Sequence, residues 1–162
     1  MDKHFTIILL IFIIVLILPD MCLLIENFET KNALEKTRTQ QLNANNQLLQ
    51  ICSNSPKTGS YHDGYCFVGE YDKGEETICA KMTKEFLDFT KKQGNDLSTP
   101  NKTNDFPGLK PGDPWCLSSI RWIEAYNHDK NLVPKIKMDA TNIKTLYYIE
   151  KEILDENKLI EH

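Results

Sequence analysis

The pattern of hydrophobic and polar positions divides the chain into three segments. Residues 5–18 are apolar except for Thr6, and the apolar run resumes over residues 21–25. Residues 26–50 are polar, rich in Asn and Gln, and contain no Gly or Pro. Beyond residue 51, short apolar runs alternate with turn residues, as in a folded domain. The pattern predicts a membrane segment over 1–25, a polar stalk over 26–50 and a domain over 51–162.

Two membrane interpretations are open for the first segment. An uncleaved transmembrane helix is favoured, because residues 5–25 supply about 20 mostly apolar residues, enough to cross a hydrocarbon core. A cleaved signal peptide is the alternative, although Asp20, Met21 and Cys22 make a poor cleavage site. Basic residues flank the segment on both sides, so the membrane orientation is not determined. The expected localisation is a single-pass membrane protein, with the side of the domain left open.

Strand signals within the domain predict a short sheet. Asp63-Gly64 stands between aromatic residues and predicts a β-hairpin, because both central residues of the tight turn need positive φ. Residues 77–82 alternate in polarity and predict a strand with one buried side. Residues 134–140 alternate in the same way and predict a further strand. The expected sheet is mixed or antiparallel.

Helix signals complete the predicted fold. Thr83 is placed to cap a helix that ends before Gly94. Asp113 reads as the N-cap of a second helix over 113–127, with proline at its first position. Residues 150–159 predict a terminal amphipathic helix. Strands and helices that mix without regular alternation indicate a small single α+β domain with two to three helices, preceded by the transmembrane helix.

A long loop over 94–116 separates the first two predicted helices. Loops of this length inside a compact domain are uncommon and tend to be functional or disordered. Its apolar residues predict an ordered loop that packs on a core shared with Phe86 and Trp122. These residues are Leu97, Phe106, Leu109 and Trp115. We expect the loop to face a ligand.

Motifs along the domain resemble one known family. They are Cys52-Ser53, Pro56-x-Thr58-Gly59, Asp63-Gly64-x-Cys66, Cys79-Ala80-x-Met82-Thr83, Asn95-Asp96-Leu97-Ser98-Thr99-Pro100, Phe106-Pro107-Gly108-Leu109, Pro111-Gly112-Asp113, Trp115-Cys116-Leu117, Arg121-Trp122-x-Glu124-Ala125 and Ala140-Thr141. On these motifs, residues 51–155 resemble the uncharacterised family termed domain of unknown function 2237. The family has no established activity, so the resemblance implies the domain and leaves its chemistry open.

The chain departs from that family pattern at three positions. Where family members tend to have a second cysteine after the Trp-Cys pair, this chain has Ser118. Where they tend to have histidines, it has Glu76 and Asn142. These replacements argue against a metal or redox role that would use those positions.

Charge and motif content narrow the class of partner. The formal net charge is −4, and no basic cluster is present, so the electrostatic footprint of a nucleic-acid binder is missing. No motif predicts a cofactor. The expected partners are the membrane, through residues 5–25, and an unknown small molecule or protein.

The cysteines leave two functional classes open. Cys52, Cys66, Cys79 and Cys116 show no C-x-x-C pair, and no His-x-x-x-His accompanies them, so no metal site is predicted. Cys116 falls in the first turn of the predicted second helix, where the helix N-terminus would stabilise a thiolate. A thiol-dependent enzyme or redox protein using Cys116 is therefore the alternative to a non-catalytic binding or structural module. The module is favoured, because no catalytic constellation is evident.

Other polar residues complete the candidate site. The catalytic candidates are Cys116, Arg121 and Asp96, and the binding candidates are Asp96, Ser98, Thr99 and Arg121. Arg121 could instead pair with Glu124, three residues along the helix. Asp96 and Ser98 could instead make only local backbone hydrogen bonds that hold the loop.

Two features bear on the compartment of the domain. Asn101-Lys102-Thr103 is a sequon for N-glycosylation, and the domain holds an even number of cysteines, as a secreted disulfide-bonded domain would. The family resemblance instead implies a cytosolic type of domain with reduced cysteines. We expect reduced thiols, with Cys79–Cys116 as the disulfide to test if the domain lies outside the cytosol.

Overall fold

The computed structural model describes residues 21–31, 40–69 and 75–160. The chain divides into two compact units, residues 1–39 and 40–162. In the first unit, residues 21–31 form an exposed helix. Among the described residues, no helix has both the length and the apolar character needed to span a bilayer. Most of the predicted transmembrane segment, residues 5–20, lies outside the described residues.

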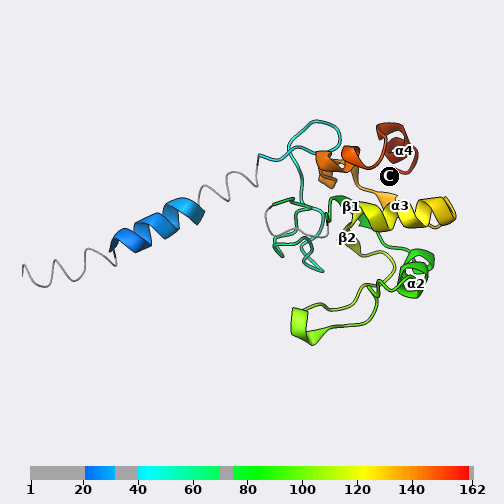
Figure 1. Cartoon of the computed structure of the whole chain (residues 1–162), viewed down its shortest axis with the longest axis horizontal. Helices are drawn as coiled ribbons and strands as arrows, with labels where there is room; N and C mark the ends of the chain where they lie inside the picture. The colour runs from blue at the N-terminus through cyan, green and yellow to red at the C-terminus, as the bar shows by residue number, and fades with distance from the viewer. Residues whose placement is uncertain (1–20, 32–39, 70–74, 161–162) are drawn as a thin grey trace, which may run out of the picture. The chain divides into compact units, whose positions relative to one another are not determined.

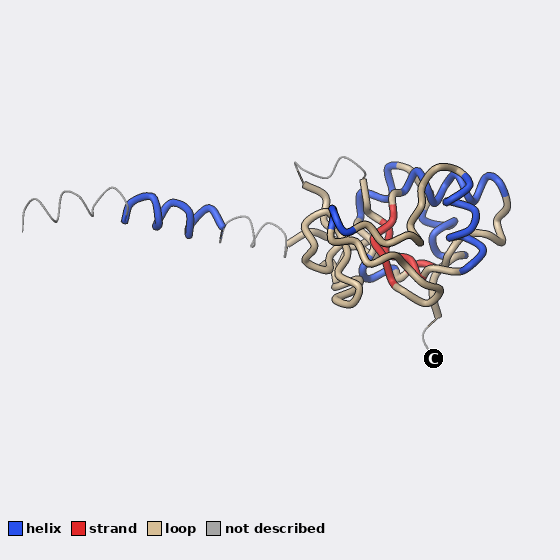
Figure 2. Tube along the Cα trace, turned by 90° about the horizontal axis from the view of Figure 1, so that it is seen from below, coloured by secondary structure: helices blue, strands red, loops and turns tan. Residues whose placement is uncertain are grey.

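The second unit is built around a three-stranded antiparallel sheet with the order β2-β1-β3. The strands are β1 (Ile78–Lys81), β2 (Pro114–Leu117) and β3 (Lys135–Ile136). Cys79 stands opposite Cys116 in the β1–β2 pair, and Ala80 stands opposite Ile136 in the β1–β3 pair. The strands lie in the centre of the domain, with most helices to one side and mostly loops to the other (Figure 2).

Three α-helices and three short 3₁₀ helices accompany this sheet in the described part of the domain. The α-helices are α2 (Lys84–Lys92), α3 (Ser119–His128) and α4 (Lys151–Glu156), and the short 3₁₀ helices are η1 (Lys102–Asn104), η2 (Met138–Ala140) and η3 (Ile143–Tyr147). The N-cap predicted for α2 is confirmed, because the Thr83 side chain accepts a hydrogen bond from Phe86 N at 3.1 Å. The terminal helix is also present, shorter than predicted. The small α+β domain is thus confirmed.

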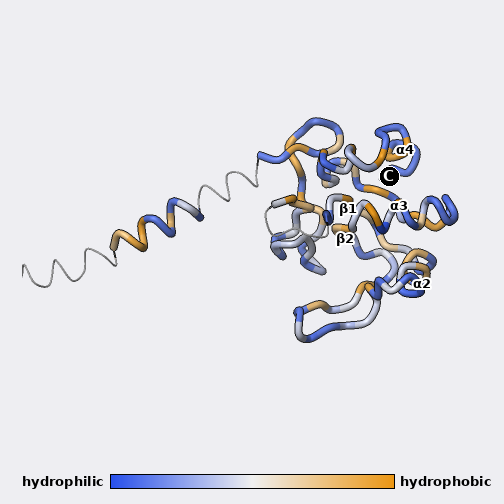
Figure 3. Tube along the Cα trace, in the orientation of Figure 1, coloured by the Kyte–Doolittle hydropathy of each residue, from blue (hydrophilic) through white to orange (hydrophobic). Residues whose placement is uncertain are grey.

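The core contains the predicted aromatic residues. Phe86 and Trp122 have no exposed surface, and Leu109 is buried with them in one cluster. Leu97, Phe106 and Trp115 are half-buried against that cluster, so the long loop is ordered by its apolar residues as predicted. The loop leaves the end of α2 as an extended arm and returns to β2 (Figure 1). Apolar positions gather along β1 and β2, and polar positions are frequent on the arm (Figure 3).

Strand β1 is buried on both sides, whereas its alternating sequence predicts one buried side. Ile78 and Ala80 face the core, but Thr77 and Cys79 are also buried. The second face is covered because two disulfides, Cys52–Cys79 and Cys66–Cys116, hold the preceding segment against β1 and β2.

The helix predicted over 113–127 begins later than predicted. Residues 114–117 form strand β2, and the helix α3 starts at Ser119. Asp113 does not cap a helix; its Oδ2 accepts a hydrogen bond from Lys110 N at 2.8 Å within a turn. Pairing with β1 satisfies the backbone groups of residues 114–117, which removes the need for a helical first turn.

Two predicted strand features are wrong or shortened. No strands flank Asp63-Gly64; Gly64 has φ of +92°, and its carbonyl accepts a hydrogen bond from Cys52 N at 2.8 Å. The N–H of Gly64 also donates a hydrogen bond to Thr58 O at 3.0 Å, so the chain here pairs with its own preceding turn and no hairpin forms. The strand predicted over 134–140 is limited to β3, because the chain then turns into η2, although the apolar positions of that range are buried as predicted.

The domain begins earlier than its predicted start at residue 51. The compact unit starts at Gln40, and Ala44 and Leu49 are buried in it. Asn43 is also buried, and its Nδ2 donates a hydrogen bond to Asp139 O at 3.0 Å. Residues 40–50 therefore belong to the domain and not to the predicted stalk. Their polar composition did not indicate this burial. Polar side chains can be buried when their hydrogen bonds are satisfied, and the sequence does not distinguish such residues from solvent-exposed ones.

Candidate functional site

An open cleft with a volume of about 590 Å³ lies between the long loop and residues 59–62. Phe106 and Trp115 form an aromatic wall, with ring centroids 5.4 Å apart and an interplanar angle of 66°. The polar residues that line the cleft are Ser60, His62, Glu76, Asp96, Thr99, Asn101, Lys102 and Asn104. Aromatic side chains and several hydrogen-bonding groups that line one cleft are typical of a small-molecule site.

The local structure explains how the two sides of the cleft are held together. Trp115 lies on β2, opposite Ala80 in the centre of the sheet. The next residue, Cys116, is bonded to Cys66, which ends the turn-rich segment that carries Ser60 and His62. A covalent link next to Trp115 therefore holds the two walls at a set separation.

A second cavity, with a volume of about 550 Å³, adjoins the first. Both cavities are lined by Glu76, Leu97 and Trp115. Ser60 Oγ donates a hydrogen bond to Glu76 Oε2 at 3.4 Å. The carboxylate of Glu76 thus lies at the boundary between the cavities, held from one side by a hydroxyl.

The residues predicted to form a site are divided between these cavities. Asp96 and Thr99 line the first, whereas Cys116 and Arg121 line the second; Ser98 lines neither. Arg121 Nη1 lies 2.9 Å from Glu124 Oε2, so the ion pair offered as the simpler alternative is formed.

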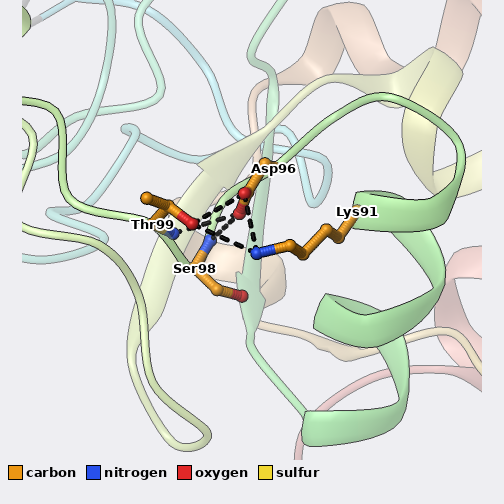
Figure 4. A network of polar contacts seen from close by, with 4 residues as sticks. All are labelled: Lys91, Asp96, Ser98 and Thr99. Atoms are coloured by element: carbon orange, nitrogen blue, oxygen red, sulfur yellow. Dashed lines mark hydrogen bonds and ion pairs between the residues drawn. The ribbon is translucent and has the colours of Figure 1, made fainter.

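The Asp96 side chain holds its own turn together by hydrogen bonds and an ion pair (Figure 4). Its Oδ1 accepts hydrogen bonds from Ser98 N at 2.9 Å and Thr99 N at 3.0 Å. Its Oδ2 accepts from Thr99 Oγ1 at 2.7 Å and forms an ion pair with Lys91 Nζ at 2.9 Å. The hydrogen bonds from Lys91 and then Thr99 lower the pKa of Asp96 well below its usual range. The local structural role is therefore the one the geometry supports.

Replacement of Asp96 by Asn is expected to destabilise the loop in a pH-dependent manner. A carboxylate whose pKa is lowered by folding stabilises the folded state above its unfolded pKa of about 4, and this contribution is lost as the pH falls through the folded pKa. The difference in urea midpoint between wild type and Asp96→Asn should therefore be largest at neutral pH and shrink below pH of about 4. Asp105→Asn, at the exposed loop tip, is the control. A difference that is the same at pH 7 and pH 3 would contradict this role.

The four cysteines of the domain are gathered in one buried cluster and bonded in pairs. The disulfides are Cys52–Cys79 and Cys66–Cys116, so the prediction of reduced thiols is wrong, as is the suggested Cys79–Cys116 pair. Cys116 lies on a strand, has no exposed surface and is not at a helix N-terminus. The proposed thiolate at this position therefore loses its structural basis.

Comparison with known proteins gives a family. A sequence profile described as an uncharacterized protein conserved in bacteria, DUF2237, matches residues 42–158. The chain belongs to the DUF2237 family. A search of curated proteins gives no match.

The three positions at which we expected departures from the family pattern lie at the cavities or next to the cysteine cluster. Glu76 lines both cavities, and Ser118 is the N-cap residue of α3. Asn142 is buried, and its Nδ2 donates a hydrogen bond to Cys66 O at 3.1 Å. In this member of the DUF2237 family, the Asn142 amide therefore holds the backbone next to the cysteine cluster.

Several cleft residues were not identified from sequence as site residues. They are Ser60, His62, Glu76, Lys102 and Phe106, and Trp115 was assigned only to the core. These residues come from three separate segments and form no spaced motif. Only the tertiary structure places them on one cavity.

Proposed function

We propose that this DUF2237 domain is a non-catalytic binding module whose cleft beside Trp115 holds a small, uncharged polar molecule. The observation that supports this proposal is that Phe106 and Trp115 line one cleft together with neutral hydroxyl and amide groups. A pyranose sugar has this combination of one apolar face and several hydroxyl groups. We take such a ring as the ligand class, because its apolar face would pack on the aromatic wall.

The charges around the cleft support a neutral ligand. Lys102 and Glu76 line the same cavity with opposite signs. The carboxylate of Asp96 is already engaged by Lys91. The remaining polar lining is hydroxyl, amide and imidazole, so no single sign of charge dominates. A strongly charged ligand would leave one of these groups opposed to a like charge.

Burial of the cysteines weighs against the alternative thiol-dependent function. A nucleophilic cysteine must present an accessible thiolate to its substrate. Cys116 is fully buried and bonded to Cys66, and the other three cysteines of the domain are buried too. The binding module is therefore the function that this geometry supports best.

Replacement of Trp115 by Ala is expected to abolish sugar binding with little loss of the fold, because the side chain is only half-buried. Binding of a panel of neutral mono- and disaccharides to the full chain can be measured by saturation-transfer NMR. Tyr147→Ala is the matched control, because Tyr147 is 81% exposed and lies outside both cavities. The proposal fails if no sugar binds, or if Trp115→Ala binds sugar as well as Tyr147→Ala does.

We further propose that residues 5–25 anchor the chain in a membrane, with the domain on the oxidising side. Support for the anchor comes from the apolar sequence of residues 5–18 and 21–25. Support for the side comes from the two disulfides, because disulfides persist mainly in oxidising compartments. The exposed sequon residue Asn101 is compatible with the same side.

Expression of the full chain in a eukaryotic secretory system is expected to give a glycosylated protein. Asn101 is exposed, and its Oδ1 accepts a hydrogen bond from Thr103 N at 3.0 Å within a turn at the loop tip. Glycosidase treatment should increase the gel mobility of wild type and of Asn104→Gln, which keeps the sequon, but not of Asn101→Gln. A membrane-bound chain without a glycosidase-sensitive shift would argue for the opposite side.

A further inference from the structure

We propose that the four cysteines of the domain, when reduced, form a binding site for one Zn²⁺ ion with four thiolate ligands. This site is separate from the cleft, and the inference does not rest on the proposed binding function. It concerns the cluster of Cys52, Cys66, Cys79 and Cys116, defined by its burial and its two disulfides.

The fold brings two of these cysteines from the sheet and two from the segment that covers it. Cys79 and Cys116 are directly opposed on β1 and β2, yet they are not bonded to each other. Each is bonded instead to a cysteine of the covering segment, Cys52 or Cys66. Four sulfur atoms from two layers therefore meet in the space between them.

Three of the four sulfur atoms already lie close to the spacing that a tetrahedral metal requires. The Sγ atoms of Cys52, Cys66 and Cys116 all lie within 4.8 Å of one another, and Cys79 Sγ is bonded to Cys52 Sγ. With Zn–S bonds of about 2.3 Å, tetrahedral coordination places sulfur atoms roughly 3.8 Å apart. Opening the two disulfides would separate the bonded pairs, and Cys52 Sγ already lies within 4.8 Å of both sulfur atoms of the other pair.

A purely cross-linking role does not account for this gathering. Each disulfide stabilises a domain by closing a loop of the chain. This stabilisation does not require the two disulfides to lie next to each other. A metal centre does require all four sulfur atoms at one point. The sequence lacks the paired spacing of common zinc motifs, because each cysteine comes from a different local element.

The surroundings of the cluster would hold the strand cysteines in place without the disulfides. Thr58 Oγ1 accepts a hydrogen bond from Cys116 N at 2.7 Å, and Thr141 Oγ1 accepts one from Cys79 N at 3.1 Å. Both threonines are buried. A closed set of four thiolates without an open position is typical of structural zinc, and soft sulfur ligands exclude Mg²⁺ and Ca²⁺.

The two states are related by a balanced exchange. Each disulfide takes up two electrons and two protons from a dithiol reductant, which is itself oxidised to a disulfide, and yields two thiols. Binding of Zn²⁺ then displaces four thiol protons and leaves four Zn–S bonds. The redox poise of the surroundings determines which state is populated, so the zinc site and the disulfides are two states of the same four sulfur atoms.

The test uses the full chain solubilised in detergent and reduced with a phosphine, which is removed under anaerobic conditions. Titration with Co²⁺ as an optical probe should saturate at one ion per chain, with intense thiolate-to-cobalt charge-transfer bands that Zn²⁺ abolishes. Zn²⁺ should also raise the melting temperature of the reduced chain and leave that of the oxidised chain unchanged. In a thiol count with a disulfide reagent, Zn²⁺ should protect the four domain cysteines, and the reactivity of Cys22, which forms no disulfide, should be the same with and without Zn²⁺.

Matched variants locate the site. Cys79→Ser should weaken Zn²⁺ binding by at least about 10- to 100-fold, because even loss of a group that only supports a metal ligand has an effect of this size. Cys22→Ser should leave binding unchanged. The inference is overturned if the reduced wild-type chain binds neither ion, or if Cys22→Ser removes the binding. Because these outcomes are measured on wild type or on a variant outside the cluster, failure of Cys79→Ser to fold does not affect them.

Discussion

Replacement of Trp122 by Ala is expected to lower the free energy of unfolding by about 3–5 kcal/mol, the usual range for truncation of a fully buried aromatic residue. Trp122 has 0% exposed surface and stacks on Tyr126, with ring centroids 5.3 Å apart. Its Nε1 also donates a hydrogen bond to Pro134 O at 3.2 Å. Truncation would leave a cavity between α3 and the sheet, together with an unsatisfied buried carbonyl.

Urea unfolding of the full chain, followed by circular dichroism, measures this effect. Ile120→Ala is a suitable control on the same helix, because Ile120 is 59% exposed and its truncation should change the free energy of unfolding by less than about 0.5 kcal/mol. A loss below about 1 kcal/mol for Trp122→Ala would mean that this side chain is not part of a rigid core.

Removal of either disulfide is expected to destabilise the domain by a similar amount. In the chain-entropy description, a cross-link stabilises more when the loop it closes is longer. Cys66–Cys116 joins residues 50 apart, and Cys52–Cys79 joins residues 27 apart. The expected losses at 25 °C are about 4 and about 3.5 kcal/mol, respectively. Each loss is a large fraction of the 5–15 kcal/mol that typically stabilises a domain.

Paired alanine variants, Cys66→Ala with Cys116→Ala and Cys52→Ala with Cys79→Ala, test this under non-reducing conditions. Alanine avoids a new buried hydroxyl group and removes both thiols of one bond together. Cys22→Ala, outside the domain, should leave the urea midpoint unchanged. Unchanged midpoints in both paired variants would show that the cross-links are not formed in the folded chain. The two losses need not add, because the bonds share one cluster.

Local signals in the sequence were sufficient for α2. The Thr83 cap reaches only three residues along the chain to Phe86 N, so both partners of the contact stand in one short window. The alternating pattern over 134–140 likewise identified Ile136, Met138 and Ala140 as buried, because burial of one face is recorded directly in polarity. The alternating pattern did not predict that the strand ends after Ile136.

The same local signals were misleading where distant segments meet. Asp113-Pro114 resembles a helix start, but residues 114–117 pair with β1, more than 30 residues earlier in the chain. The buried Asn43 gives no apolar signal, and one of its hydrogen-bond partners, Asp139 O, lies 96 residues along the chain. The hydrogen-bond partners of these backbone and side-chain groups lie far away in the chain, so a short stretch of sequence does not include them.

The sequence by itself therefore determined the family, the α+β class, the capped helix α2 and the aromatic core around Trp122. The tertiary structure alone decided the pairing of the cysteines, the role of Asp96 and the lining of the cleft. The bonded cysteines are 27 and 50 residues apart, and the sequence does not indicate which cysteine bonds to which. Glu76, His62 and Trp115 likewise become one surface only when the sheet, the covering segment and the long loop pack together, because their proximity is a property of the fold and not of their spacing.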